Sequence, residues 1–330
     1  MVVFDAYIRA KIDGDRMEGR WVKPYAADYS LLFSASRGES RRFLKPEKAG
    51  FDVSGKWEVM FYDDNDSSIA VGQFTQVGSK VEGSFARTTG DYRFLEGVVS
   101  GDSLLLSAFD GTNAYLFKAA MNGDGSLKGE FFSGKTGYSR WTATKNENAA
   151  LPDPSGIASV REGSQTLSFT LPSLDGSMVS VADERFKDKA VIVQIMGSWC
   201  ANCLDETKFL AEWHRTNRDK PVEIVALAFE RKDDINYAKR LLWRYVERFN
   251  IQYPILFAGD NSRENVARVL PEIDKLSAYP TTIFLDKNGQ IRKIYTGFNG
   301  PATGVYYERF VEEFEAYMKT LMDEGAEKAG

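Results

Sequence analysis

The chain contains 330 residues, of which 43% are hydrophobic, and carries a formal net charge of -5 at pH 7. Its length is about twice that of an ordinary domain, so two domains with conventional hydrophobic cores are expected. It has no long basic run that would attract a nucleic acid, and no apolar stretch approaching the ~18 residues of a membrane span.

The chain starts abruptly, as if a strand begins at once. The opening stretch MVVFDAYIR lacks the basic start, the apolar centre and the small-residue cleavage site of a signal peptide. We therefore expect that an export segment has been removed from the natural protein.

Residues 1–145 have the pattern of an antiparallel β domain. Short runs of alternating polar and apolar residues follow one another about every 8–12 residues, which is typical of a barrel or a sandwich. Turn-forming pairs such as Asp13-Gly14 and Asp124-Gly125 separate the runs. No set of residues in this half has catalytic spacing, so the sequence leaves its task open. The expected strands cover residues 56–62, 80–85, 92–99, 103–109, 114–120, 126–132 and 138–144.

Residues 146–164 are rich in Pro, Ser, Gly and Ala and have weak periodicity, which indicates a linker. From 165 to 330 strands alternate with helices, which predicts an α/β domain with a mixed sheet and helices on both faces. The expected strands cover residues 190–196, 222–229, 255–257, 282–286 and 290–296, and the expected helices 200–218, 233–249, 262–270 and 305–321.

The only two cysteines, Cys200 and Cys203, lie in the stretch GSWCANC. A structural zinc site needs four ligands, and with one histidine in the chain carboxylates would have to complete it. A disulfide across three residues closes too short a loop to remove much chain entropy. The spacing therefore suits a metal site or a structural crosslink poorly, and it favours a dithiol that is oxidised and reduced in turn.

Cys200 is expected at the start of a helix that follows a buried strand. The first turn of a helix has unpaired N–H groups and a partial positive charge, both of which stabilise a thiolate. We therefore expect Cys200 to ionise readily and to act as the nucleophile. Cys203 lies one turn further along and should be more buried, so we expect it to resolve the mixed disulfide.

The stretch SAYPTTIFLD places Pro280 at the start of a hydrophobic strand. A proline there could be a plain strand-start residue, but in this arrangement the sequence favours a cis peptide bond after Tyr279. A cis bond would bring the backbone of Tyr279, Pro280 and Thr281 beside the dithiol. We expect these three residues to bind an extended substrate through main-chain hydrogen bonds.

Together these parts resemble the thioredoxin fold, and residues from about 165 to 325 are similar to the TlpA/ResA-like thiol-disulfide oxidoreductases found outside the bacterial cytoplasm. The similarity rests on the stretches SFTLPSLDGSMVSVAD, AVIVQIMGSWCANCLDE, VEIVALAFER and YPTTIFLDKNGQI. The last of these, with TGFNGPATG after it, resembles Bacteroidetes members of the family. Residues 1–145 resemble the β-rich accessory domains that precede such modules.

The resemblance implies roles for further residues. A glutamate three residues after the second cysteine often tunes the dithiol in this family; here it is Glu206, with an exposed acid favoured by the helix dipole as the alternative. Gln194 stands where cytoplasmic thioredoxins keep a buried aspartate, which leaves Glu206 as the candidate proton carrier. Lys208 stands in place of a proline that is frequent in the family. Trp199 is expected to cover the thiols and touch the substrate, with simple packing as the alternative.

Two other positions have less defined roles. His214, the only histidine, is expected to be a surface or packing residue. Phe229, Glu230 and Arg231 end a strand on the side where open α/β sheets usually bind ligands. They either border the site or form a local salt bridge.

The sequence and the resemblance together predict a two-domain extracytoplasmic enzyme, a dithiol-disulfide oxidoreductase that reduces disulfides of exported proteins. A membrane thiol reductant would regenerate the dithiol, and a segment absent from this chain would allow anchoring to the membrane. No cofactor or metal is implied, because the cysteines carry the electrons. The alternatives are a peroxiredoxin-like peroxidase, a disulfide oxidase, and a non-enzymatic binding protein in which the β-rich domain is the functional part.

Overall fold

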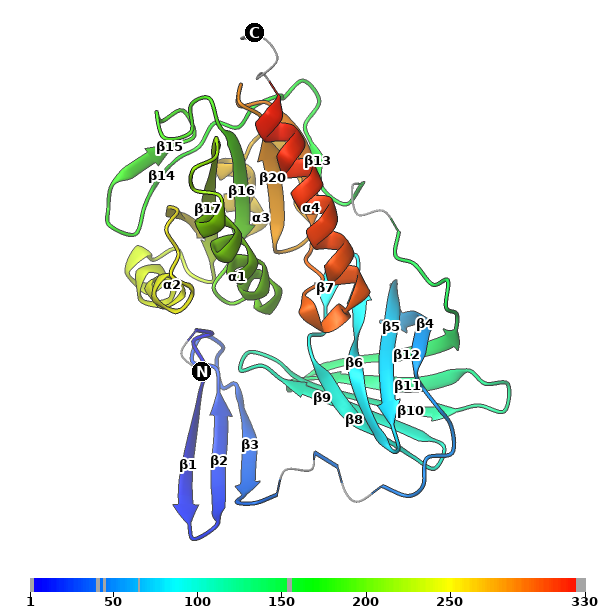
Figure 1. The fold of residues 1–330 in the computed structure, drawn as a ribbon. Coiled ribbons are helices and arrows are strands. Elements are labelled where there is room, and N and C mark those ends of the chain that lie inside the picture. The colour runs from blue at the N-terminus through cyan, green and yellow to red at the C-terminus, as the bar shows by residue number, and fades with distance from the viewer. Residues whose placement is uncertain (1–2, 40–41, 44–45, 65, 153–155, 325–330) are drawn as a thin grey trace. The chain divides into compact units, whose positions relative to one another are not determined.

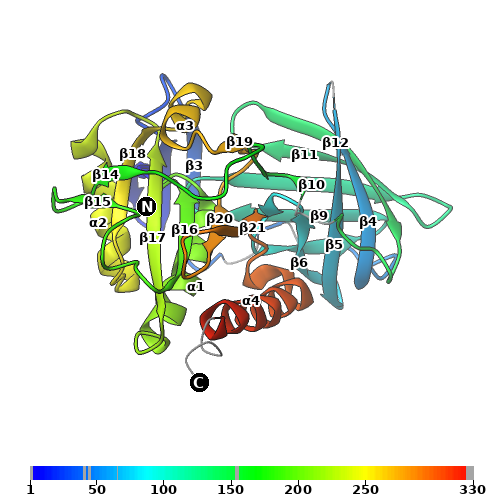
Figure 2. The same cartoon turned by 90° about the horizontal axis from the view of Figure 1, so that it is seen from above.

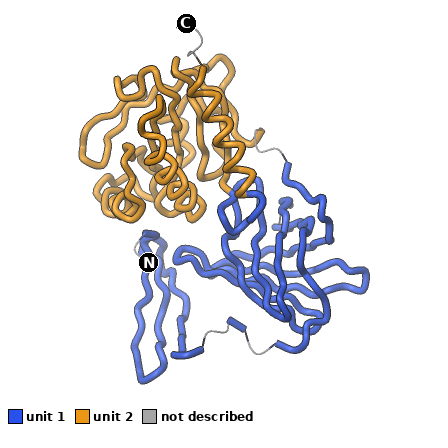
Figure 3. Tube along the Cα trace, in the orientation of Figure 1, with its two compact units in different colours: residues 1–152, 299–306 blue, residues 153–298, 307–330 orange. Residues whose placement is uncertain are grey.

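The computed structural model describes residues 3–39, 42–43, 46–64, 66–152 and 156–324. The chain divides into two compact units, each built around its own core (Figure 3). Unit 1 contains residues 1–152 together with 299–306, and unit 2 contains residues 153–298 and 307–330. Among the described residues, no helix combines the length and the apolar character needed to cross a bilayer.

Most of unit 1 is a closed antiparallel barrel (Figure 1). Its strands follow the order β5-β4-β12-β11-β10-β9-β8-β6, and pairing of β5 with β6 closes the ring; the short β7 (Gly90–Asp91) adds to β6. The sequence prediction of an all-β barrel or sandwich is therefore confirmed as a barrel. The eight strands are β4 (Gly55–Tyr62), β5 (Ser67–Val77), β6 (Lys80–Arg87), β8 (Leu95–Ser100), β9 (Ser103–Phe109), β10 (Ala114–Met121), β11 (Leu127–Ser133) and β12 (Gly137–Lys145).

Aromatic side chains fill the interior of the barrel. Along each strand alternate residues point inward, so one side of the pleat is apolar. Trp57, Phe85, Phe117 and Trp141 are among the largest fully buried side chains. Phe117 stacks on Phe131 with ring centroids 4.4 Å apart. The barrel interior is a packed core made by its own side chains.

A separate three-stranded sheet precedes the barrel: β1 (Tyr7–Asp13), β2 (Arg16–Val22) and β3 (Ser30–Ser36). Trp21 on β2 is buried, and its ring contacts Tyr29 and Phe109 edge to face. The sequence pattern did not separate this sheet from the barrel, because the same turn residues punctuate both.

Unit 2 is built on a five-stranded mixed sheet in the order β18-β17-β16-β20-β21, as the alternating pattern predicted. Strands β16, β17 and β18 run parallel, and β20 and β21 are antiparallel to their neighbours. The strands are β16 (Ala190–Met196), β17 (Val222–Glu230), β18 (Ile255–Asp260), β20 (Thr281–Leu285) and β21 (Ile291–Thr296).

Helices cover both faces of this sheet (Figures 1 and 2). Helices α1 and α4 share one face, where Phe209 and Phe314 pack with ring centroids 5.0 Å apart. Helix α3 covers the other face and contributes Val269 to the core there. The helices are α1 (Ala201–Thr216), α2 (Ile235–Phe249), α3 (Arg263–Val269) and α4 (Val305–Asp323).

Short elements complete the two units. In unit 2, β13 (Ser159–Val160) pairs with β19 (Ile273–Lys275), and β14 (Thr170–Pro172) forms a hairpin with β15 (Met178–Ser180). A 3-10 turn, η2 (Pro301–Thr303), lies in the part of unit 1 that follows β21 in the chain. The backbone N–H of Gly300, just before this turn, donates to Asp91 Oδ2 over 2.5 Å.

Candidate active site

The two cysteines lie at the start of helix α1, just after the buried strand β16. Every residue of β16 is buried, and the chain turns through Gly197, Ser198 and Trp199 before α1 begins. A Cβ at Gly197 would lie 2.8 Å from the carbonyl oxygen of Phe229 and would meet the ring of Trp199, so only glycine fits this turn. The sequence therefore forces a tight strand-to-helix connection immediately before the first thiol.

Cys200 is the N-cap residue of α1, and its Sγ accepts a hydrogen bond from the backbone N–H of Cys203 over 3.1 Å. The two cysteines form a disulfide, with Cα atoms 5.2 Å apart. Cys200 keeps 8% of its surface exposed, whereas Cys203 is fully buried. The predicted placement is confirmed: the outer sulfur lies at the positive end of the helix and the inner one beneath it.

The peptide bond between Tyr279 and Pro280 is cis, as predicted. The carbonyl oxygen of Tyr279 lies 3.4 Å from Cys200 Sγ, so this loop borders the disulfide. Thr281 is fully buried, its Oγ1 donates to the carbonyl of Ala278, and it pairs in register with Ile195 of β16. The loop thus presents main chain to the sulfur, and the side chain of Thr281 turns into the protein.

Trp199 is half-buried and held in place from several sides. Its Nε1 donates to the carbonyl of Phe229 over 2.9 Å, and its ring meets that of Tyr279 edge to face with centroids 5.1 Å apart. The guanidinium of Arg231 lies 5.5 Å from the indole centroid, within cation–π range. These contacts fix the indole one residue before Cys200.

Glu206 is buried in the layer between α1 and the sheet, with 2% of its surface exposed. Its carboxylate accepts hydrogen bonds from Gln194 Nε2 over 2.7 Å and from Thr282 Oγ1 over 2.8 Å. Burial raises the pKa of Glu206 to about 7, and these two hydrogen bonds offset part of that rise. The alternative of an exposed first-turn acid is therefore wrong.

Glu230, at the end of β17, fixes the turn that carries Trp199. It is fully buried, and its two carboxylate oxygens accept from the backbone N–H and the hydroxyl of Ser198 over 2.9 and 2.7 Å. The hydroxyl of Tyr245 donates to the carbonyl of Ser198 over 2.9 Å. Sequence reasoning placed Glu230 at the ligand-binding side of the sheet but did not identify the contacts of Ser198 with Glu230 and Tyr245, because they join segments far apart in the chain.

His214 lies farther along α1 and is a packing residue, not a surface one. It is 6% exposed, and its Nε2 lies 3.0 Å from Glu223 Oε1. Its ring meets that of Tyr253 edge to face. Within the described residues, no group of three or more His, Cys, Asp or Glu side chains could hold a metal ion.

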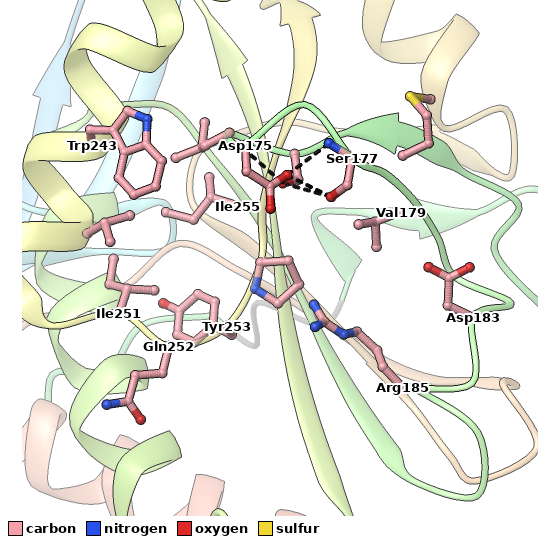
Figure 4. A pocket seen from close by; sticks show the side chains of 15 residues that line it. Asp175, Ser177, Val179, Asp183, Arg185, Trp243, Ile251, Gln252, Tyr253 and Ile255 are labelled. Atoms are coloured by element: carbon pink, nitrogen blue, oxygen red, sulfur yellow. Dashed lines mark hydrogen bonds between the residues drawn. The ribbon is translucent and has the colours of Figure 1, made fainter.

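A separate hollow of about 470 Å³ lies at the other end of the sheet (Figure 4). Its lining includes Tyr253, Ile255, Trp243 and Arg185. Ile255 begins β18, whereas Cys200 follows the end of the parallel strand β16. The hollow therefore sits at the amino end of β18, and its lining includes no residue of the dithiol site.

Comparisons with known proteins match the part of the chain that contains the two cysteines. The Redoxin family profile matches residues 161–307. Thiol-disulfide oxidoreductase ResA of Bacillus subtilis (strain 168) is 26% identical over 142 residues, which cover 43% of this chain and 71% of that protein. ResA of Geobacillus thermodenitrificans (strain NG80-2) is 29% identical over 138 residues, covering 42% and 71%.

Among solved structures, a thiol:disulfide interchange protein of Chlorobium tepidum TLS aligns with 50% of this chain and 99% of its own. Its TM-score is 0.37 and its sequence identity 21%. A DsbF homologue from Corynebacterium diphtheriae aligns with 51% of this chain and 98% of its own, with a TM-score of 0.36 and 24% identity.

The dithiol at the helix start, the cis-prolyl loop beside it and the Redoxin match define unit 2 as a thioredoxin-like domain. The protein is a thiol-disulfide oxidoreductase. More particularly, its thioredoxin-like part is similar in sequence to ResA, and an antiparallel barrel precedes it in the chain.

Proposed function

We propose that this chain reduces disulfide bonds of exported proteins by passing through a mixed disulfide on Cys200. The single observation that carries the proposal is the position of Cys200 Sγ at the start of α1, bonded to Cys203 and 3.4 Å from the Tyr279 carbonyl. A thiolate in this position is stabilised by the helix dipole and by the N–H of Cys203.

The reaction begins with the reduced dithiol. The thiolate of Cys200 attacks one sulfur of the substrate disulfide, that S–S bond breaks, and the other substrate sulfur leaves as a thiolate. Cys203 then loses its proton and attacks Cys200 Sγ, which releases the second substrate thiolate. The products are the Cys200–Cys203 disulfide and a substrate dithiol, so two electrons have passed from the protein to its substrate.

Glu206 is proposed to take the proton that Cys203 gives up. Its buried carboxyl lies one helical turn beyond Cys203, and burial raises its pKa to about 7. A group with such a pKa can accept a proton and return it to solvent near neutral pH. Thr282 and Gln194 hold the carboxylate in place through their hydrogen bonds.

The substrate is proposed to bind as an extended chain against the loop formed by Tyr279, Pro280 and Thr281, with Trp199 covering the sulfurs. The contact of the Tyr279 carbonyl with Cys200 supports this, because a polypeptide attached at that sulfur lies beside the main chain of the loop. Trp199 presents a half-buried indole beside the same loop.

The working compartment is proposed to lie outside the cytoplasm, in the periplasm or cell envelope. A membrane-held thiol reductant would return electrons to the Cys200–Cys203 disulfide after each turnover. The similarity to ResA supports the assignment. The barrel is proposed to be an accessory domain of this oxidoreductase.

The proposal is tested by trapping. A Cys203→Ala variant should accumulate mixed disulfides on Cys200 when mixed with oxidised envelope proteins, and mass spectrometry would identify them. The matched Cys200→Ala variant should trap none. If the pre-reduced protein consumes peroxide faster than it reduces protein disulfides, the assignment is wrong in favour of a peroxidase. A redox potential well above that of thioredoxin would instead indicate an oxidase.

A further inference from the structure

A hollow of about 560 Å³ opens on the side of Tyr279 that faces α3 and β19. Val266, Ala267, Ile273 and Leu276 give it apolar walls. Polar and charged side chains complete the lining: Asn261, Arg263, Asp274, Lys275, Ser277 and Tyr279. A volume of this size accommodates one or two side chains of a polypeptide.

Tyr279 connects this hollow to the reacting sulfur. Its carbonyl oxygen lies 3.4 Å from Cys200 Sγ, its ring packs against Trp199, and the residue is part of the lining of the hollow. The hydroxyl of Tyr279 is buried and has no hydrogen-bond partner among the described residues. A buried hydroxyl without a partner is costly, so a ligand that supplies an acceptor there is favoured.

The charges on the lining select among such ligands. Arg263 and Lys275 are exposed, and within the described part of the chain neither forms an ion pair. Asp274 lines the same hollow. Asp260 lies outside the lining, and its negative charge, after burial, contributes to raising the pKa of Tyr279. The lining itself thus holds two cations without ion-pair partners and one carboxylate, Asp274, with the carboxylate of Asp260 beyond it.

We infer that this hollow is a specificity subsite for an acidic side chain of the substrate polypeptide, close in sequence to its disulfide cysteine. The inference rests on the proposed function. The apolar walls would hold the methylenes of a glutamate, the hydroxyl of Tyr279 would donate to its carboxylate, and Arg263 and Lys275 would supply the complementary charge. Charge-assisted hydrogen bonds of this kind are stronger than neutral ones, so glutamate should be preferred over glutamine.

The test uses the pre-reduced full-length chain and short disulfide-containing peptides that differ at one position, from two residues before to two after the cysteine. Each position carries Glu, Gln or Lys in turn, and the measured quantity is the second-order rate constant of peptide reduction. At the peptide position that reaches the subsite, we expect the rate constant to be highest with Glu, lower with Gln and lowest with Lys. The rate constants for Glu and Lys should differ about tenfold.

Substitutions in the lining test whether the hollow causes this preference for Glu. Tyr279→Phe keeps the ring and should reduce the preference for Glu and Gln, while Arg263→Ala with Lys275→Ala should reduce the ratio of Glu to Lys to about one. Arg268→Ala removes a cation from the same helix outside the lining and should keep the wild-type ratio.

The neutral bis(2-hydroxyethyl) disulfide, too small to reach the hollow, is measured in parallel. If the wild type reduces it and all peptides react at one rate, the subsite is overturned while the oxidoreductase function stands. If neither it nor the peptides react, the proposed function fails and the subsite with it.

Discussion

Gln194 on β16 and Glu206 on α1 are joined in the buried layer next to the dithiol, where the amide of Gln194 donates to Glu206 Oε2 over 2.7 Å. Glutamine cannot take up a proton, and neither can the hydroxyl of Thr282 that completes the group at neutral pH. Glu206 is therefore the titratable member of this network, and its behaviour can be isolated by one substitution.

The rate of disulfide reduction should rise as the pH passes about 7. Burial raises the pKa of Glu206 to about 7, and only the ionised carboxylate can accept the proton of Cys203. In Glu206→Gln this inflection should disappear, and the rate at about pH 8 should fall at least about tenfold. The measurement is a single-turnover pH profile, with the exposed Glu212→Gln on the same helix as its control. An unchanged profile in Glu206→Gln would exclude the proton-carrier role.

The same carboxyl should make the stability of the oxidised protein depend on pH. In the unfolded chain it ionises near its ordinary value of 4.5, but in the folded protein only near 7. Between these values the folded state holds the proton more tightly, so the stabilisation present below about pH 4.5 is lost as the pH rises through about 7. The free energy of unfolding should lose about 3 kcal/mol from this group over the interval.

Glu206→Gln supplies the comparison for that prediction. Denaturant unfolding of both oxidised proteins at about pH 4.5 and about pH 7.5 gives the difference in their free energies of unfolding at each pH. We expect the difference to shift in favour of the variant by about 3 kcal/mol at the higher pH. A constant difference between the two proteins would contradict a raised pKa at this position.

The two thiols of the reduced protein should react at different rates with iodoacetamide. Cys200 caps the helix and keeps some exposure, whereas Cys203 is fully buried. Alkylation should therefore modify Cys200 more than about tenfold faster, as read by peptide mapping over time. In Cys200→Ser the remaining thiol should react slowly. Preferential modification of Cys203 would reverse the assignment of nucleophile and resolving thiol.

Gly197→Ala should disturb the site without touching either cysteine. The added methyl group would lie 2.8 Å from the Phe229 carbonyl and against the Trp199 ring, so the indole must leave its hydrogen bond. We expect changed tryptophan fluorescence and slower reduction of peptide disulfides. Gly123→Ala is a matched control, because the same methyl group there meets no atom within 4 Å and, as at Gly197, the backbone φ is not positive. Equal effects of the two substitutions would show that the turn at Gly197 has no special role.

Much of the site could be predicted because its signals are local. The two-residue spacing of the thiols, the preceding buried strand and the prolyl strand start each occupy a short stretch of sequence. The cis bond after Tyr279 and the helix start at Cys200 follow from those stretches. Pairings between distant segments could not be predicted in this way, and they decide which polar groups are buried.

Helix α1 shows how contacts with distant segments bury polar residues. Glu206, Thr207 and His214 are polar, yet all three are buried, because Gln194, Thr282 and Glu223 on the sheet supply their partners. A hydrophobic pattern assigns such residues to the solvent side of a helix. In unit 1 the strand β5 was not predicted for a similar reason, since its polar residues interrupt the alternation that marks a strand.

The closure of the barrel restricts how unit 1 can receive a partner. Once β5 pairs with β6, each strand of the ring is hydrogen-bonded on both sides, so an incoming polypeptide finds no free backbone row on which to extend it. The small sheet ends instead in the outer strands β1 and β3, each of which has one unpaired flank in the described residues. Among the described residues of this unit, recognition by strand addition is thereby confined to those two flanks and to the outer edge of the two-residue β7, and any other partner must bind through side chains and loops.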